Sequence, residues 1–194
     1  MELRIETPKF IHSQFIEDIT LADKIVEFFH SHSFLHTLGG AKKSTEDEID
    51  YTIKKSTDIN IRDQLHIFPV FKELEYQIQK VLNVYLDIYP RCNALDSFYL
   101  TPYNIQYYKP EEGFLEWHCE TPCGEQPYVS RVLTFMMNCN TSDGGTEFLH
   151  QDFISTSEKG KLTIFPADWT FTHRGLPASK EKMIVTGWWN FEQV

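Results

Sequence analysis

Apolar side chains recur at steps of three and four residues in the stretch that follows Pro69. The repeating positions are Val70, Phe71, Leu74, Ile78, Val81, Leu82, Tyr85 and Leu86. This spacing places them on one face of an α-helix, and a proline suits the first turn because N–H groups there have no intrahelical acceptor. Pro90 ends the run, so the pattern predicts a scaffold helix that packs on a sheet.

A shorter amphipathic stretch lies nearer the N-terminus. Thr20 and Asp23 have the spacing of a helix-capping box. The apolar face that follows consists of Leu21, Ile25, Val26, Phe28 and Phe29. Residues 37–60 contain a Gly-Gly pair and a cluster of charged residues, so we expect a loop or a weakly structured crossing there.

From Ser97 onward the pattern changes to short runs rich in β-branched and aromatic residues. Candidate strands are 98–108, 114–118, 131–138, 146–149, 161–165 and 183–190. Turn-forming residues lie at 109–113, 123–127, 142–145 and 166–169. Short strands at this spacing predict a sandwich or jelly roll, and helices on one side of it give an α+β fold.

The size and charge of the chain narrow the class of protein. A length of 194 residues favours one domain, 1–194, with a helical part of about 1–95 and a strand-rich core of about 96–194. The formal net charge is −10, with 18 basic residues against 28 acidic ones, which disfavours nucleic acid as the main partner. No apolar stretch is long enough to cross a membrane, and the N-terminus lacks the pattern of a signal peptide. We therefore expect a cytoplasmic protein with no membrane partner.

The candidate chemistry begins at Trp117-His118-Cys119-Glu120. His118 and Glu120 are two residues apart, and such residues point to the same face of a strand. His173 lies far downstream, and a sheet fold can bring it to the same point. Two histidines and one carboxylate on one face of a metal ion are typical of non-haem iron(II) oxygenases. Eight histidines in 194 residues also produce an H-x-E triplet by chance fairly often, so the triplet alone favours an ordinary strand histidine over a metal ligand.

A longer series of motifs surrounds these residues, from about 102 to 191. It starts with a tyrosine, a glycine-containing turn, the H-x-E triplet, an arginine that begins an apolar strand, and Gly-Gly-Thr followed by an aromatic residue. It continues with Lys-Gly, an apolar strand ending in Phe-Pro, a distal histidine, a proline, and a lysine that opens a last strand containing tryptophan. The residues concerned are Tyr108, Gly113, His118, Glu120, Arg131, Gly144, Gly145, Thr146, Phe148, Lys159, Gly160, Phe165, Pro166, His173, Pro177, Lys182 and Trp188. In order and approximate spacing, the series resembles the prolyl 4-hydroxylase-like branch of the iron(II)/2-oxoglutarate-dependent oxygenases.

The resemblance implies a double-stranded β-helix, or jelly-roll, core with N-terminal helices packed on one face. It implies a 2-oxoglutarate-dependent dioxygenase that hydroxylates an unactivated C–H bond in a small molecule or peptide, the candidate being a peptidyl or free proline-like substrate. Iron(II), 2-oxoglutarate and O2 are the implied cofactors, with ascorbate as a candidate stimulant.

The resemblance also implies roles for individual residues. His118, Glu120 and His173 match the metal ligands. Tyr108, Thr146 and Lys182 match positions that bind the co-substrate, whose far carboxylate needs a buried cation and hydroxyl donors. Arg131 matches a position on the substrate side of the site.

Two departures from the family pattern leave alternatives open. Glu120 stands where the family usually carries aspartate, and Glu116 and Asp143 are rival carboxylates nearby. The spacing from His173 to Lys182 is one residue shorter than expected for this branch, so Lys180 and Arg174 rival Lys182 for the distal carboxylate.

Two other functions compete with the hydroxylase. One is a non-catalytic jelly-roll binding module, and the other is a cupin-like metalloenzyme that does not use 2-oxoglutarate. The presence of Lys182 and Tyr108 beside the ligand motif argues for the hydroxylase, because a binding module does not need groups that clamp a co-substrate. The patterns assign no role to residues 1–60 and no oligomeric state.

Overall fold

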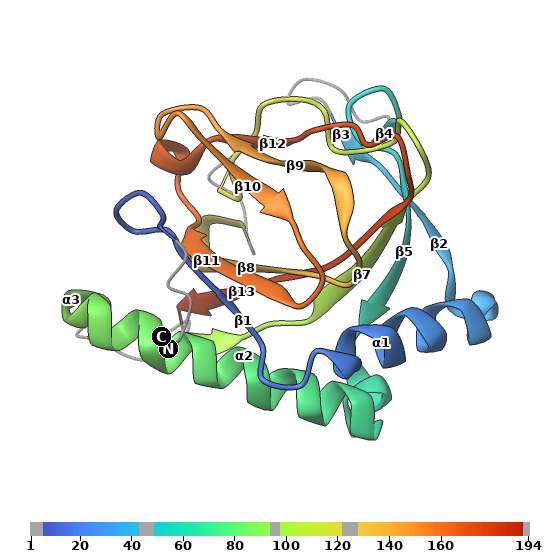
Figure 1. Ribbon diagram of the computed structural model, residues 1–194, viewed down its shortest axis with the longest axis horizontal. Helices are drawn as coiled ribbons and strands as arrows, with labels where there is room; N and C mark the ends of the chain where they lie inside the picture. The colour runs from blue at the N-terminus through green and yellow to red at the C-terminus, as the bar shows by residue number, and fades with distance from the viewer. Residues whose placement is uncertain (1–5, 43–48, 94–97, 122–127, 192–194) are drawn as a thin grey trace.

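The computed structural model describes residues 6–42, 49–93, 98–121 and 128–191 (Figure 1). It has three layers: a pair of helices, a large sheet and a smaller sheet (Figure 1). The helices lie along one face of the large sheet, and the smaller sheet lies on the opposite side. This arrangement agrees with the predicted α+β jelly roll with helices on one face.

The helical elements come mostly from the first half of the chain. They are α1 (Thr20–Ser31), α2 (Pro69–Ile88) and α3 (Pro90–Asn93), with short 3-10 turns at η1 (Ser33–Leu35), η2 (Asp63–Ile67), η3 (Tyr128–Ser130) and η4 (Trp169–Phe171). The long helix begins at Pro69 and ends before Pro90, as the apolar repeat predicts.

The predicted capping box at the start of α1 is wrong. The helix begins at Thr20, and Ile19 occupies the N-cap position without a side-chain hydrogen bond. The Thr20 hydroxyl donates instead to Asp18 Oδ1, which also accepts from the Thr20 backbone N–H at 3.0 Å. Asp18 therefore accepts the hydrogen bonds at the start of α1, a role that the sequence pattern had assigned to the Thr20–Asp23 pair.

All pairings between the strands are antiparallel. The large sheet runs in the order β1 (His12–Phe15), β11 (Lys161–Pro166), β8 (Arg131–Asn138), β13 (Lys182–Phe191), β7 (Tyr103–Tyr108), β5 (Ser56–Ile61) and β2 (Thr37–Gly39), and β6 (Phe98–Leu100) pairs with β13. The smaller sheet has the order β10 (Phe153–Ser157), β9 (Ser142–Phe148) and β12 (His173–Gly175). A two-stranded ribbon joins β3 (Ala41–Lys42) to β4 (Ile49–Asp50).

Residues 37–60 differ most from their prediction as a loop. Strands β2 and β5 extend the large sheet there, with β5 paired to β7. The strand pattern was hidden because Ser56 and Asp58 are buried although they are polar. Burial of such groups depends on partners elsewhere in the fold, which local hydrophobicity does not report.

Three further differences concern the strand-rich half. Residues 114–118 were predicted to be a strand but form only single bridges, at Phe114 and His118. Residues 142–145 were predicted to be a turn but belong to β9, where a Cβ on Gly145 would lie 2.8 Å from Ser155 O. These glycines thus allow close strand approach. Strands β1, β10 and β12 were not predicted, and the predicted turn at 123–127 lies outside the described residues.

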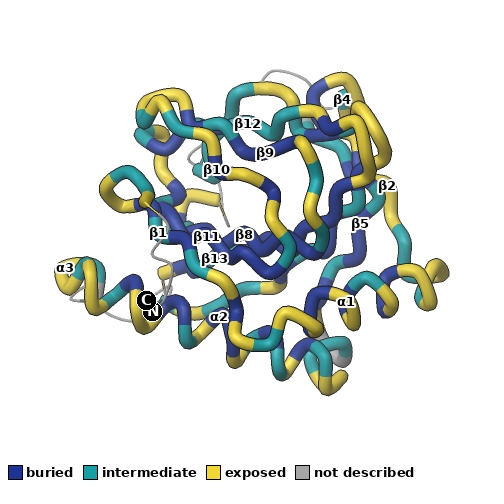
Figure 2. Tube along the Cα trace, in the orientation of Figure 1, coloured by how far each residue is buried: buried dark blue, intermediate teal, exposed yellow. Residues whose placement is uncertain are grey.

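The two faces of the large sheet have different surroundings. On β13, Met183, Val185 and Trp189 belong to the apolar core shared with α1 and α2, and the strands of this sheet are largely buried (Figure 2). The alternate residues of β13, from Lys182 to Trp188, line a cavity on the other face. The sheet therefore separates an apolar core from a polar cavity. Among the described residues, no helix is long and apolar enough to span a membrane.

Candidate metal centre and co-substrate pocket

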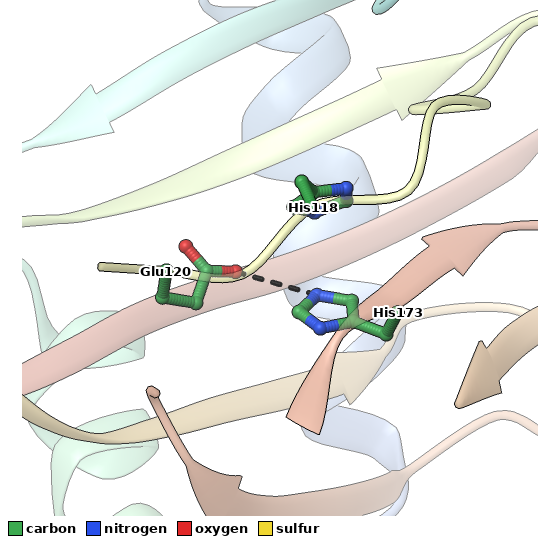
Figure 3. A group of neighbouring side chains, drawn as sticks. All are labelled: His118, Glu120 and His173. Atoms are coloured by element: carbon green, nitrogen blue, oxygen red, sulfur yellow. Dashed lines mark ion pairs between the residues drawn. The ribbon is translucent and has the colours of Figure 1, made fainter. Parts of the chain in front are cut away.

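His118 and His173 are brought together by their backbones. His118 N donates to His173 O at 2.9 Å, and His173 N donates to His118 O at 2.8 Å. His173 lies on β12, whereas His118 belongs to an irregular segment that touches β12 at this one bridge. The ring centroids are 4.4 Å apart (Figure 3). The two imidazoles therefore meet as cross-strand neighbours.

The hydrogen bonds of the two rings set which nitrogen is free. His118 Nδ1 lies 2.8 Å from Glu116 O, and His173 Nδ1 lies 2.9 Å from Phe171 O. A backbone carbonyl only accepts, so each Nδ1 carries a proton and each Nε2 is the nitrogen left to face a metal ion. Burial, followed by the neighbouring His173, lowers the pKa of His118 to about 3. His118 is therefore a neutral imidazole, the form that binds metals.

Glu120 supplies the third donor. Its backbone N–H donates to Ala167 O at 3.0 Å, and its Oε1 lies 3.4 Å from His173 Nε2, the contact drawn in Figure 3. The other oxygen, Oε2, accepts from Trp188 Nε1 at 2.9 Å and from Arg131 at 3.2 Å. One carboxylate oxygen thus accepts two hydrogen bonds, and the other faces the histidines.

The charge on Glu120 is secured by its neighbours. Burial raises the pKa of its carboxyl group, but the adjacent His173 side chain and the charge of Arg131 outweigh burial and lower the pKa to about 2. Glu120 is therefore an anion at every ordinary pH. Donor atoms from the three residues lie within 4.8 Å of one another, and no other such group of three is found among the described residues.

The rival carboxylates lie elsewhere. Glu116 is exposed, and its contribution near the site is the backbone carbonyl that accepts from His118. Asp143 is exposed and accepts from Ser179 N at 2.9 Å. Geometry therefore favours Glu120 over both as a partner of the two histidines.

A cavity of about 420 Å³ opens between the two sheets beside these three residues. Lys182 lines it and is 5% exposed, and its ammonium lies 5.3 Å from the centre of the Tyr108 ring. Burial lowers the pKa of Lys182 to about 8, and the residue has no carboxylate partner in the described part of the chain. A buried cation without a counter-charge suits an anionic ligand.

The two rivals of Lys182 do not share this environment. Lys180 is exposed. Arg174 donates to Glu147 at 2.8 Å and lies over the Trp117 ring at 4.4 Å. Of the three basic residues, Lys182 is therefore the one placed to meet a ligand inside the cavity.

Tyr108 and Thr146, the other predicted co-substrate residues, also line the cavity. The Tyr108 hydroxyl donates to Gln106 Oε1 at 2.8 Å, and the Thr146 hydroxyl lies 3.4 Å from the sulfur of Met136. Thr146 and Gly175 are paired across β9 and β12, so Thr146 lies two residues along the ladder from His173. The sequence-predicted residues thus surround one space.

Arg131, which was predicted to lie on the substrate side of the site, contacts the candidate metal ligand Glu120. Its Nη1 donates to both the backbone oxygen and the side chain of Glu120, at 3.0 and 3.2 Å. Its guanidinium stacks over the Trp188 ring at 3.6 Å. Arg131 and Trp188 together hold Glu120 Oε2, a contact that sequence spacing does not indicate.

Two other neighbours of the site were not identified from the sequence. The Phe114 ring stacks on the His118 ring with centroids 3.5 Å apart and planes 7° apart. Lys54 lines the cavity from the region predicted to be a loop. No local signal marks either residue, because both reach the site through tertiary contacts.

Comparison with known proteins finds one family model that matches the part of the chain carrying these features. Residues 103–190 match the family model described as the 2OG-Fe(II) oxygenase superfamily. A prolyl-4-hydroxylase from Pseudomonas putida has 14% identity and a TM-score of 0.70, over 95% of this chain and 94% of that one. A viral collagen prolyl hydroxylase from Paramecium Bursaria Chlorella virus-1, solved with 2OG, has 16% identity and a TM-score of 0.68, over 95% and 97%.

A prolyl hydroxylase from Trichoplax adhaerens, solved with a hypoxia inducible factor peptide, has 13% identity and a TM-score of 0.68 over 93% of this chain and 83% of that one. No curated protein matches the chain in sequence. At these identities the structural likeness defines a shared fold.

Proposed function

Because residues 103–190 match the 2OG-Fe(II) oxygenase family model and the chain has the fold of the prolyl hydroxylases, we propose that it is a 2OG-Fe(II) oxygenase that hydroxylates a proline-like substrate at a metal held by His118, Glu120 and His173. The observation that carries these ligand roles is the convergence of the three donors within 4.8 Å beside a cavity with a buried lysine. The reaction class and the cofactors, iron(II), 2-oxoglutarate and O2, follow from the family.

The donor set fits iron(II). It offers two neutral nitrogens and one anionic oxygen, and three protein ligands leave positions open for other ligands. The backbone carbonyls that accept from each Nδ1 orient the imidazoles, and Arg131 and Trp188 orient the carboxylate. Such outer contacts also compensate for the extra methylene of glutamate, since they hold the longer side chain in one position.

Iron(II) with 2-oxoglutarate and O2 supplies the oxidation, in which one oxygen atom enters the substrate C–H bond and the other enters succinate as carbon dioxide leaves. Lys182 would bind the distal carboxylate of the co-substrate, and the Thr146 hydroxyl would donate to it. The Tyr108 hydroxyl would donate to it in place of Gln106 Oε1, its present acceptor. A buried ammonium is favourable there because the low local dielectric strengthens the ion pair. Met136 and Ile184, which also line the cavity, exclude water from this end.

The proline-like substrate is proposed from the solved structures that share this fold. The neighbours are prolyl hydroxylases, and the Trichoplax adhaerens protein was solved with a peptide fragment. A fold hosts many substrates, so the choice needs its own test. Its support in this chain is a cavity large enough for a side chain or small molecule beside the co-substrate position.

The test of the proposed function is the conversion of 2-oxoglutarate to succinate by purified protein with iron(II) and ascorbate. We expect slow succinate formation without added substrate and faster formation with a proline-containing compound. Lys182→Ala is expected to raise the 2-oxoglutarate concentration needed by roughly 30- to 1,000-fold while metal binding persists, since it removes a charge-assisted contact. Lys180→Ala is the matched control. An effect of Lys180→Ala instead would move the co-substrate cation to Lys180.

A further inference from the structure

A second buried lysine faces the cavity from the region to which the sequence assigns no role. Lys54 lies between β4 and β5, is 8% exposed and lines the cavity. Its ammonium lies 3.1 Å from Asp58 Oδ2, the one hydrogen-bond partner that it has within the described ranges. An ammonium has three protons to donate, so two remain for an acceptor inside the cavity.

The position of Lys54 is built into the fold. Its backbone forms a β-bridge with Phe114, whose ring stacks on His118. Its partner Asp58 lies against β2 in space that a side chain at position 39 would fill, because a Cβ on Gly39 would overlap Asp58 Oδ2. The lysine is therefore held next to the segment that carries the first histidine, and Gly39 explains part of the Gly-Gly pair in the sequence.

The charge of the cavity wall is opposite in sign to that of the whole chain. The formal net charge of the chain is −10. Among the described lining residues, the cations are Lys54, Arg131 and Lys182, and the carboxylate is Glu120. Arg131 pairs with Glu120 inside the cavity, and Lys182 is assigned to the co-substrate. Lys54 is the remaining cation of the wall, and its partner Asp58 does not line the cavity.

The size and polarity of the cavity limit what Lys54 can meet. Asn60 and Asn104 continue the wall on β5 and β7, and Asn60 Nδ2 donates to Asn104 Oδ1 at 2.8 Å. A volume of about 420 Å³ lies near the lower end of ligand pockets, which span roughly 300–1,000 Å³, and the same space has to accept the co-substrate. These features favour a small polar molecule over a bulky apolar one.

We propose that Lys54, held by Asp58, binds a carboxylate of the primary substrate, so that the substrate is a small carboxylic acid of the amino-acid type. This inference rests on the proposed function, because it concerns the substrate of the same site. A free proline-like acid provides the carboxylate beside the ring. An internal proline in a peptide provides it only when an acidic side chain lies next to it, and the experiment separates these two sources.

The experiment measures binding of matched acid and amide pairs. The first set consists of free L-amino acids, L-proline included, and their carboxamides. The second set consists of short blocked peptides with glutamate or glutamine next to proline. Ligand-induced shifts in melting temperature are recorded under nitrogen with Mn(II) and 2-oxoglutarate, so that no turnover occurs.

Three variants accompany the wild-type protein. Lys54→Met removes the ammonium but leaves Asp58 buried without its partner, which destabilises a fold. The double variant Lys54→Met with Asp58→Asn removes both charges and keeps the site testable. Lys55→Met is the matched control, because the Lys55 side chain is 55% exposed and pairs with Glu112 outside the cavity wall.

We expect the wild-type protein and Lys55→Met to bind at least one acid about 10- to 100-fold more tightly than its amide, and both Lys54 variants to lose this preference. Preference within the peptide set alone assigns an acidic peptide as the source. Equal binding of acids and amides by the wild-type protein overturns the proposal, as does a preference that survives in the Lys54 variants. Wild-type succinate formation tests the proposed function separately, so a protein that makes succinate without this preference refutes the role of Lys54 alone.

Discussion

Replacing Lys182 by methionine is expected to stabilise the unliganded protein while it destroys co-substrate binding. Burial lowers the pKa of Lys182 from 10.5 to about 8. At 1.36 kcal/mol per pH unit, this change corresponds to a cost of up to roughly 3 kcal/mol for holding the charged ammonium in the folded chain. Methionine has a similar length without the charge, so the variant avoids this cost at pH 7.

The pH dependence follows from the direction of the shift. Below pH 8 the lysine is protonated in both the folded and unfolded chains, and the full cost is present. Between pH 8 and 10.5 the folded chain loses the proton first, so the free energy of unfolding of the wild-type protein rises with pH. The advantage of Lys182→Met therefore shrinks over this window and disappears above it.

Urea unfolding in the presence of a chelator, at pH 7, 8.5 and 10, measures this difference. Lys180→Met is the control, because a change at an exposed lysine alters stability by less than about 0.5 kcal/mol. With Mn(II) and 2-oxoglutarate present, the order reverses, since binding stabilises only the wild-type protein. A variant less stable than the wild-type protein at pH 7, or more stable by the same amount at every pH, would refute the reasoning.

The other predictions concern the metal centre. His118→Ala and His173→Ala are each expected to abolish metal binding and succinate formation, and full activity in either variant would remove that residue from the ligand set. Glu120→Asp is expected to keep measurable succinate formation, because the carboxylate retreats by roughly 1 Å but keeps its charge. Glu120→Ala should lose most of it, and turnover equal to the wild-type protein would exclude Glu120 as a ligand. Trp188→Phe keeps an aromatic ring under Arg131 but removes the bond to Oε2, so metal titration should show roughly tenfold weaker binding, and an unchanged affinity would show that this bond does not orient Glu120.

The helix α2 and the strand β8 were predictable because the residues that each of them buries are mostly apolar. Residues 131–138 and the start at Pro69 agree with the structure. Strand β5 was not predictable, because its buried residues include the polar Ser56 and Asp58, and the partner of Asp58 is Lys54, outside the strand. A polar residue in the interior looks like a loop residue until its partner is known.

The identity of the three converging residues was predictable from motif order, but the way they converge was not. The sequence placed His118 and Glu120 on one strand face, two residues apart. In the structure this segment is irregular, and His118 meets His173 through a pair of backbone hydrogen bonds. The contacts of Arg131 and Trp188 with Glu120 were not predictable either, because they join β8 and β13 to a segment outside both strands.

The position of β1 at the border of the large sheet has a consequence for how the chain folds. Among the described residues this strand pairs with β11 alone, so His12 can pair only after Ile164, about 150 positions further along, has been synthesised. Contacts that join distant parts of a chain slow folding, because closing the intervening loop costs conformational entropy before the pairing contributes stability. During synthesis, β1 stays unpaired until residues 161–166 emerge, and β8 keeps one unpaired edge until residues 182–191 emerge. Such edges are templates for association between chains. Low temperature and slow expression should therefore increase the yield of soluble protein more than changes to the helices.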